Sequence, residues 1–351
     1  MLKQVLRYPL WLGELLTGSK SFVANPLIGS RRLNRWGLHV ARVVLAHGVM
    51  RLRMGVLSWR VPRDDRRQFI EQGFVIKTNF LPEAEYRALV EEVRQADGEV
   101  RQCCQGDAQT RRMLLSPEML VDMPRARAVL RAPAFRRLMR FCAGHLRMPI
   151  CHAEWVMNGV SDAPADPQTH LHVDTFQPTM KFWLYLEEVS DINGPFIYVP
   201  GSQRLSRRRL AWEYAMSREA KTHADRYTAR GSFRVTPEQA QALGDAPPRA
   251  FRVPGNTLLI ANTFGVHARG GAEPGSSRLA LWGMSRTNPF IPLPGLGFEW
   301  VNRLQYRVLQ RQRREQDKRA AARDVQASWH RIDADDAWPR NASADRYGEH
   351  G

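Results

Sequence analysis

Two histidines and an aspartate stand at alternate positions in the segment His170-Leu-His172-Val-Asp174, and residues of these types can bind a metal ion. In a β-strand successive side chains point to opposite faces, so residues 170, 172 and 174 would share one face. A further ligand must come from elsewhere, and His267, 95 residues after His172, is the candidate. Two histidines and one carboxylate on one side of an iron ion leave positions open for substrate and oxygen.

An arginine follows His267 at a distance of 11 residues. Arg278 opens the apolar run of residues 279–284, which is typical of a buried strand. A guanidinium can bind a carboxylate through two parallel hydrogen bonds, as a dicarboxylic keto acid near iron would require. A strand arginine in a surface ion pair is the common alternative. That alternative weakens because the spacing to a candidate ligand also fits.

The elements that must position these residues are strands. Between residues 150 and 290, short runs rich in Val, Ile, Phe, Trp and Tyr are separated by Gly, Pro and Asn. We expect Asn193-Gly194 to form a tight hairpin turn and Pro200-Gly201-Ser202 to end the returning strand. The connection over residues 202–248 is long and charged, which favours a lid or a substrate-binding loop.

The segment 183–202 resembles the central block of phytanoyl-CoA dioxygenase-like proteins: a Trp-led strand, an acidic turn, Asn-Gly, a second strand and Pro-Gly-Ser. The sequence around residues 69–90 and the spacing from His267 to Arg278 match the same family, so the resemblance covers residues 68–290. It implies a mainly β fold with flanking helices. That fold is a double-stranded β-helix, a cupin-like jelly roll of two sheets closing over iron.

The resemblance also implies an activity and a set of ligands. The activity would be that of an Fe(II)- and 2-oxoglutarate-dependent dioxygenase, which uses O2 to hydroxylate a small or lipid-like, anionic substrate. Carried over residue by residue, the family pattern makes His172, Asp174 and His267 the iron ligands. Arg278 would bind the far carboxylate of 2-oxoglutarate. Trp183 falls where the family places an aromatic beside that cosubstrate, although a core strand tryptophan explains it equally well.

Three further positions bear on this assignment. Val173 stands inside the His-x-Asp motif in place of a polar residue, and Arg269 stands where a small hydroxyl residue often helps to hold the cosubstrate. Arg269 would be a second carboxylate partner or would face solvent. Halogenating relatives have a small residue where Asp174 stands, so its carboxylate predicts hydroxylation rather than halogenation.

The positive charge of the chain is concentrated in two segments. The net charge is +17, and residues 1–67 hold 13 basic residues against 3 acids, while residues 303–323 hold 8 against 2. A helix between Gly29 and Pro62 would place apolar residues on one face and arginines on the other. Such a helix favours peripheral contact with an anionic membrane. The predicted apolar face comprises Leu33, Trp36, Val40, Val43, Val44, Met50 and Met54, and the predicted basic face comprises Arg31, Arg35, Arg42 and Arg53.

Composition and charge together suggest an organisation and a location. We expect a basic, partly amphipathic helical extension over residues 1–67, an oxygenase domain over 68–300, and a basic C-terminal helix with a flexible tail over 301–351. Four cysteines without a Cys-x-x-Cys motif favour a reducing compartment. The expected location is cytoplasmic, at the inner face of a membrane. Nucleic acid is not an expected partner because no binding motif is present.

Two alternatives remain open at this stage. A cupin-type metal enzyme would use His170, His172 and His267 and leave Asp174 outside the ligand set. A non-catalytic β-sandwich would instead bind anionic membrane or nucleic acid through its basic flanks. The intact set of candidate ligands and the arginine argue against this second alternative.

Overall fold

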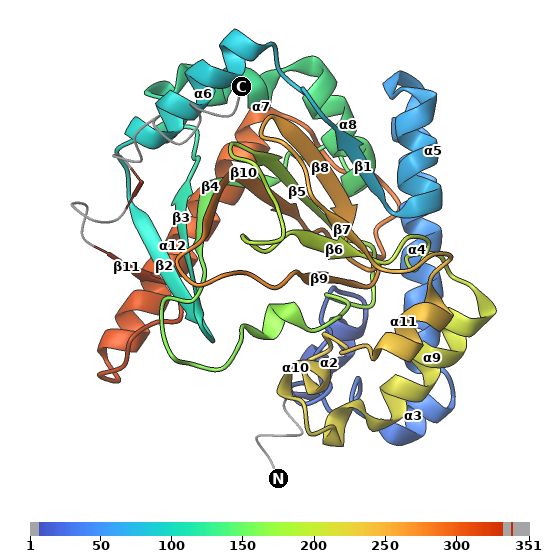
Figure 1. Cartoon of the computed structure of the whole chain (residues 1–351). Coiled ribbons are helices and arrows are strands. Elements are labelled where there is room, and N and C mark those ends of the chain that lie inside the picture. Colours follow the sequence, from blue (N-terminus) through green and yellow to red (C-terminus); the bar gives the residue numbers. More distant parts are fainter. Residues whose placement is uncertain (1–6, 333–337, 340–351) are drawn as a thin grey trace.

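The computed structural model describes residues 7–332 and 338–339 (Figure 1). Its strands are β1 (Phe74–Lys77), β2 (Val100–Gln105), β3 (Ala108–Leu114), β4 (Ile150–Met157), β5 (Met180–Tyr185), β6 (Phe196–Tyr198), β7 (Arg249–Phe251), β8 (Thr257–Asn262), β9 (His267–Arg269), β10 (Ser277–Ser285) and β11 (His330–Arg331). They form an eight-stranded sheet in the order β1-β8-β5-β10-β4-β3-β2-β11 and a three-stranded sheet in the order β7-β6-β9. All of the pairings are antiparallel.

Helices cover one face of the large sheet and one end of the molecule (Figure 1). The α-helices are α2 (Tyr8–Leu15), α3 (Arg31–Arg35), α4 (Leu38–Leu57), α5 (Arg63–Gln72), α6 (Glu83–Gln95), α7 (Pro124–Arg131), α8 (Pro133–Ala143), α9 (Arg207–Glu219), α10 (Arg226–Ala229), α11 (Pro237–Leu243) and α12 (Glu299–Ala321). Short 3-10 helices are η1 (Ser58–Arg60), η2 (Met119–Val121), η3 (Pro167–Thr169) and η4 (Ala220–Thr222).

Alternation along β5 shows how the two faces of the large sheet are used. Phe182 and Leu184 belong to the core shared with helices α6, α7 and α8. Trp183 and Tyr185 point to the other face, where they pack with Phe196 of the small sheet. A strand that is buried on both faces must be apolar throughout, as β5 and β8 nearly are. Two sheets with a second core between them confirm the predicted double-stranded β-helix.

The predicted hairpin at Asn193-Gly194 is wrong. Gly194 has φ 74° and makes a turn, but β5 lies in the large sheet while β6 lies in the small one. The turn therefore carries the chain from one sheet to the other, and the Asn193 side chain braces it by accepting a hydrogen bond from the Ser190 backbone N–H. Strand β6 ends at Tyr198, just before Pro200.

The helix expected between Gly29 and Pro62 is broken, and its predicted faces are only partly right. Val43 and Met50 of the predicted apolar face are buried, whereas Trp36 and Val44 are exposed. Gly37, at φ 90°, separates α3 from α4. Arg42 and Arg53, which were expected on the solvent face, are buried. Arg42 donates hydrogen bonds to the carbonyls of Leu15, Thr17 and Ser19, because the chain after α2 supplies carbonyl oxygens that the sequence pattern cannot reveal.

The long connection between β6 and β7 folds as α9, α10 and α11 and contacts the N-terminal helices. Arg209 of α9 is fully buried and pairs with Glu213 at 2.9 Å. Glu213 also accepts a hydrogen bond of 2.8 Å from Nε2 of His39 on α4. This buried network joins residues that lie far apart in the sequence, so the N-terminal helices are part of the same packed body.

Helix α12 packs against the large sheet and contacts β4 and β2. Its Tyr306 hydroxyl accepts a hydrogen bond of 3.1 Å from the Cys151 backbone N–H. Its Asp317 accepts hydrogen bonds from Arg101 of β2. The tail expected to be flexible lies mostly outside the described residues. Within the described part of the chain, no helix is both long and apolar enough to cross a bilayer.

Candidate metal centre

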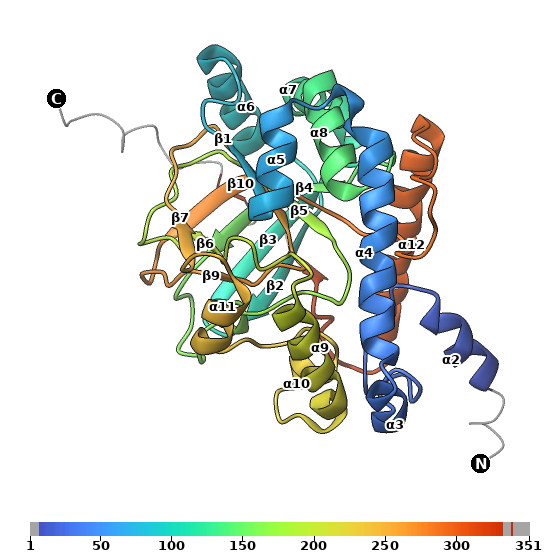
Figure 2. The same cartoon turned by 90° about the vertical axis from the view of Figure 1, so that its right-hand side faces the viewer.

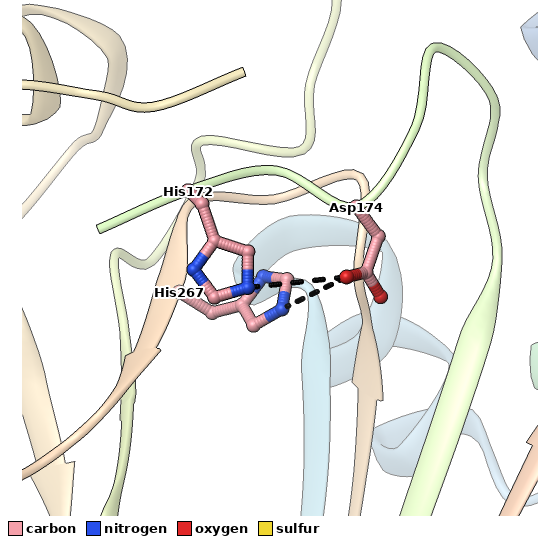
Figure 3. A group of neighbouring side chains, drawn as sticks. All are labelled: His172, Asp174 and His267. Carbon is pink, nitrogen blue, oxygen red and sulfur yellow. Dashed lines mark ion pairs between the residues drawn. The ribbon is translucent and has the colours of Figure 1, made fainter. Parts of the chain in front are cut away.

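Three side chains converge between the two sheets (Figure 3). His172, Asp174 and His267 each present one potential ligand atom, and these atoms lie within 4.8 Å of one another. Oδ1 of Asp174 is 3.9 Å from Nε2 of His172 and 3.8 Å from Nε2 of His267. Neighbouring ligands about 2.1 Å from one ion lie roughly 3 Å apart, so a small contraction would let all three atoms bind the same ion.

Backbone pairing holds the two histidines side by side. The N–H of each donates to the carbonyl of the other at 2.9 Å, and their rings are 4.4 Å apart. Asp174 donates its N–H to the Thr263 carbonyl, just beyond β8. His172 and His267 are 95 residues apart in the sequence, but they lie side by side because the backbone of residue 172 pairs with β9.

The second nitrogen of each imidazole fixes the orientation of its ring. Nδ1 of His172 lies 2.7 Å from the His170 carbonyl, and Nδ1 of His267 lies 2.9 Å from the Gly265 carbonyl. A neutral histidine that donates from Nδ1 keeps a lone pair on Nε2, as metal-binding histidines do. Both Nε2 atoms are buried and have no hydrogen-bond partner among the described residues. The lone pairs of these two Nε2 atoms are therefore free to bind a metal ion.

Burial keeps both imidazoles neutral. It lowers the pKa of His267 to about 4 and the pKa of His172 well below its usual value. Burial alone would raise the pKa of Asp174, but nearby cations, Lys181 foremost and Arg286 further away, hold that pKa well below its usual value. The group therefore combines two neutral nitrogen donors with one carboxylate, which is the donor set of a two-histidine, one-carboxylate iron site.

Lys181 of β5 is a member of this site that the sequence prediction missed. Its Nζ lies 2.7 Å from Oδ2 of Asp174. That pairing leaves Oδ1 as the oxygen that faces the histidines. The signal was present in the sequence, because Lys181 stands two residues before Trp183 and strand alternation puts both on the same face.

A pocket of about 320 Å³ opens beside the three side chains. Arg278 and Trp183, the two residues assigned to the cosubstrate from the sequence, both line it. Arg278 donates to the Gly194 carbonyl, so the turn between the sheets helps to aim its guanidinium. Trp183 is buried, and its ring lies 4.8 Å from that of Phe196.

Arg269 does not face solvent. It lines the same pocket, but it pairs with the buried carboxylate of Asp166 and donates to Oδ1 of Asn158 at 3.4 Å. Asp166 therefore neutralises much of the charge of Arg269. Arg112 is similarly paired, with Glu154 at 2.6 Å, and lies over the ring of Trp282.

His170 is exposed and does not join the group. The expected alternation along a strand fails here because residues 170–174 form no regular strand, and His172 is the residue among them that forms β-bridges.

The two-sheet fold and the buried group define the class of protein: a double-stranded β-helix with three side chains able to hold a metal ion. The model of the family described as phytanoyl-CoA dioxygenase (PhyH) matches residues 69–244, half of the chain. The chain belongs to that family, which confirms the resemblance seen in its sequence. It is thus a 2-oxoglutarate-dependent oxygenase or a related enzyme, and Fe(II) and 2-oxoglutarate are the cofactors of this class.

Solved structures whose chains follow a similar path include that of the epimerase SnoN in complex with Fe³⁺, α-ketoglutarate and nogalamycin RO. It is 16% identical, covers 64% of this chain and 83% of its own, and has a TM-score of 0.44. The carbocyclase SnoK is 19% identical, with coverages of 64% and 83% and a TM-score of 0.40. HygX from Streptomyces hygroscopicus, with nickel and 2-oxoglutarate bound, is 16% identical, with coverages of 65% and 88% and a TM-score of 0.42. These likenesses are too distant to carry an argument. No curated protein matches the chain.

Proposed function

We propose that this protein is an Fe(II)- and 2-oxoglutarate-dependent hydroxylase in which His172, Asp174 and His267 bind the iron. The observation that carries the proposal is the pair of buried Nε2 atoms, unpartnered among the described residues, that face one oxygen of Asp174. A buried polar atom without a partner costs free energy. A metal ion would satisfy all three atoms at once.

The neighbouring residues bind the cosubstrate, orient Asp174 and exclude water. Arg278 lines the pocket and holds the far carboxylate of 2-oxoglutarate, while Trp183 packs against the cosubstrate. Lys181 pairs with one oxygen of Asp174 and so directs the other toward the ion. The walls contributed by the two sheets exclude water from the reacting C–H bond.

With Fe(II) and 2-oxoglutarate bound, the site would convert 2-oxoglutarate, O2 and a substrate C–H bond to succinate, CO2 and an alcohol. Because Asp174 occupies the position that a halide would need, hydroxylation is the outcome we propose over halogenation. Desaturation or ring formation is the alternative that can follow the same removal of a substrate hydrogen.

The pocket favours an anionic substrate. Five basic side chains and two acids line it. Fe(II) and the 2-oxoglutarate dianion cancel one another in charge, so the excess positive charge remains for the substrate. A small or lipid-like molecule with a negatively charged group meets this requirement.

The iron assignment is tested by the metal content of alanine variants after anaerobic loading with Fe(II). His172→Ala and His267→Ala should each lose most of the iron. His170→Ala is the matched control, because His170 lies on the same segment but is exposed. The cupin-type alternative predicts the reverse for His170 and no loss for Asp174→Ala. Full iron content in both His172→Ala and His267→Ala would refute the proposal.

We also infer that the protein contacts an anionic membrane through the outer face of α4. The helix and the adjoining η1 expose an almost wholly apolar row. The members of that row, here called the α4 stripe, are Ala41, Val44, Leu45, Gly48, Arg51, Leu52, Gly55, Val56 and, from η1, Trp59. Figure 2 shows α4 as a long helix at the surface, with α2 projecting near its lower end. A helix of 20 residues is about 30 Å long and can lie in a membrane surface.

The charges beside the α4 stripe favour an anionic membrane as its partner. Trp36 and Trp59 are each 71% exposed, one before and one after α4. Arg32 lies over the ring of Trp36 at 4.8 Å, and Arg60 over that of Trp59 at 3.9 Å. Tryptophan and arginine together suit the boundary between headgroups and acyl chains, where the indole is half-buried and the guanidinium meets phosphate.

A further inference from the structure

A second pocket, of about 340 Å³, adjoins the candidate metal centre. It lies where the N-terminal segment 18–25 meets Thr175 and Gln177, which follow Asp174 directly. Arg286, one residue beyond the end of β10, lines both this pocket and the metal pocket. A ligand could therefore extend from one pocket into the other past Arg286.

Three cations from three separate segments line the second pocket: Lys20, Arg230 and Arg286. Among the described residues, neither arginine forms an ion pair with a carboxylate, and Arg286 acts on Asp174 only from a greater distance. Lys20 donates to the backbone carbonyl of Asp174 and has no carboxylate partner of its own. One acid, Glu14, also lines the pocket, and its carboxylate accepts a hydrogen bond of 2.7 Å from Asn25. The pocket is thus positively charged overall.

Lys20 lies beside other cations, which is unfavourable for its own positive charge. Lys20 shares the lining of the second pocket with Arg230 and Arg286. A cation kept beside other cations costs free energy unless an anion joins it. The hydroxyl of Thr175 is also buried without a hydrogen-bond partner among the described residues, and it can donate to an anion.

The cofactors of the proposed function do not supply this anion. The 2-oxoglutarate carboxylate is assigned to Arg278, and Asp174 is shared between the iron and Lys181. Three cations and a free hydroxyl arranged around one space match the several oxygens and the double charge of a phosphate better than a single carboxylate.

We propose that the second pocket binds a phosphomonoester group of the substrate, through Lys20, Arg230 and Arg286, while the C–H bond to be oxidised lies in the metal pocket. This inference rests on the proposed function for the reaction, but the binding of phosphate can be tested without turnover. It gives the N-terminal segment a role in substrate recognition, because Lys20 comes from that segment.

The test is calorimetric titration of the protein loaded with Fe(II) and 2-oxoglutarate under anaerobic conditions. The probe is sn-glycerol 3-phosphate, and glycerol is the neutral control ligand. We expect one glycerol phosphate bound per chain and no binding of glycerol. Arg286→Gln and Lys20→Gln should each weaken binding by about tenfold, whereas Arg286→Lys should retain most of it, since the charge is kept. Lys221→Gln, an exposed lysine that lines neither pocket, is the control variant.

A second arm identifies the source of the phosphate. Dihexanoyl phosphatidic acid that binds at least tenfold more tightly than glycerol phosphate would indicate a lipid substrate, and equal affinities would indicate a small phosphomonoester. No saturable binding by the wild type, or affinities unchanged in both glutamine variants, would overturn the proposal. A protein that binds Fe(II) and 2-oxoglutarate but not glycerol phosphate would leave the proposed function standing and remove only the phosphate site.

Discussion

His172 and His267 show how single residues prepare the candidate site. Each directs Nδ1 to a backbone carbonyl two residues earlier in the chain, so each ring is held with Nε2 toward Asp174. The residue types and spacing predicted this set before its geometry was known. They did not predict Lys181 as the partner of Asp174. Strand alternation places Lys181 on the same face as Trp183, but it does not show that Asp174, on another segment, lies opposite.

Arg278 provides the first prediction at this scale. Arg278→Leu should weaken 2-oxoglutarate binding by about a hundredfold, because it removes a two-pronged contact with a carboxylate worth roughly 3 kcal/mol. Iron content should be unchanged, since Arg278 is not among the candidate ligands. Anaerobic titration of the iron-loaded protein with 2-oxoglutarate measures the affinity.

The control for this prediction is Arg252→Leu. Arg252 pairs with Asp191 in an exposed ion pair away from the pocket, so its loss should leave 2-oxoglutarate binding as it is. An Arg278→Leu protein with wild-type affinity for 2-oxoglutarate would place the cosubstrate carboxylate elsewhere, and the paired Arg269 would then be the next residue to examine.

Among the elements, α4 departs furthest from its sequence-based prediction. Periodicity identified a helix in this region but assigned its faces only partly correctly, since arginines were expected to face solvent. The structure instead buries Arg42 and Arg53 against carbonyl oxygens and exposes the apolar α4 stripe. Hydrophobic periodicity cannot reveal which polar partners a distant segment supplies, so the burial of Arg42 and Arg53 could not be predicted from the sequence.

The buried face of α4 makes stability depend on pH. Burial lowers the pKa of His47 to about 3, so the folded protein keeps this imidazole neutral while the unfolded chain takes up a proton below pH 6.5. Stability present above pH 6.5 is therefore lost as the pH falls toward 3. Between pH 7 and pH 5 the loss from this one residue is about 2 kcal/mol.

His47→Gln should remove that part of the pH dependence, because glutamine does not titrate. Urea unfolding at pH 7 and pH 5 gives the two free energies of unfolding, and their difference should be about 2 kcal/mol smaller in the variant. The exposed His223→Gln is the control. An identical difference in His47→Gln and wild type would mean that the buried imidazole is not the source of this acid sensitivity.

The outer face of α4 gives a separate prediction about membrane contact. Replacing Leu45 and Leu52 with glutamate should reduce sedimentation with phosphatidylglycerol vesicles at least tenfold, because two charges replace apolar side chains at the expected interface. Binding of the wild type should fall with added salt and be weak on phosphatidylcholine.

Ile70→Glu is the matched control for membrane contact, because Ile70 is an exposed apolar residue on α5, outside the α4 stripe. Wild-type protein that ignores anionic vesicles at low salt would contradict the membrane proposal. A dimer that dissociates in the Leu45→Glu, Leu52→Glu variant would assign the surface to a second copy of the chain.

At the scale of the whole molecule, parts without a counterpart in the predicted core converge on one side of the metal centre. The N-terminal segment brings Lys20 to the Asp174 carbonyl, and the connection after β6 brings Arg234 into a bridge with His172. The family resemblance predicted the central sheets and the candidate ligands. It could not predict these additions, because their contacts join residues more than 60 positions apart and leave no local pattern.

The central claim is that the buried group activates O2 with 2-oxoglutarate as cosubstrate. The most direct measurement exposes the Fe(II)- and 2-oxoglutarate-loaded protein to ¹⁸O2, with catalase present, and analyses the succinate formed. The account predicts succinate with one labelled oxygen from the wild type and from His170→Ala, and almost none from Asp174→Ala or His267→Ala. Unlabelled succinate, no succinate from the wild type, or equal yields from wild type and Asp174→Ala would contradict it.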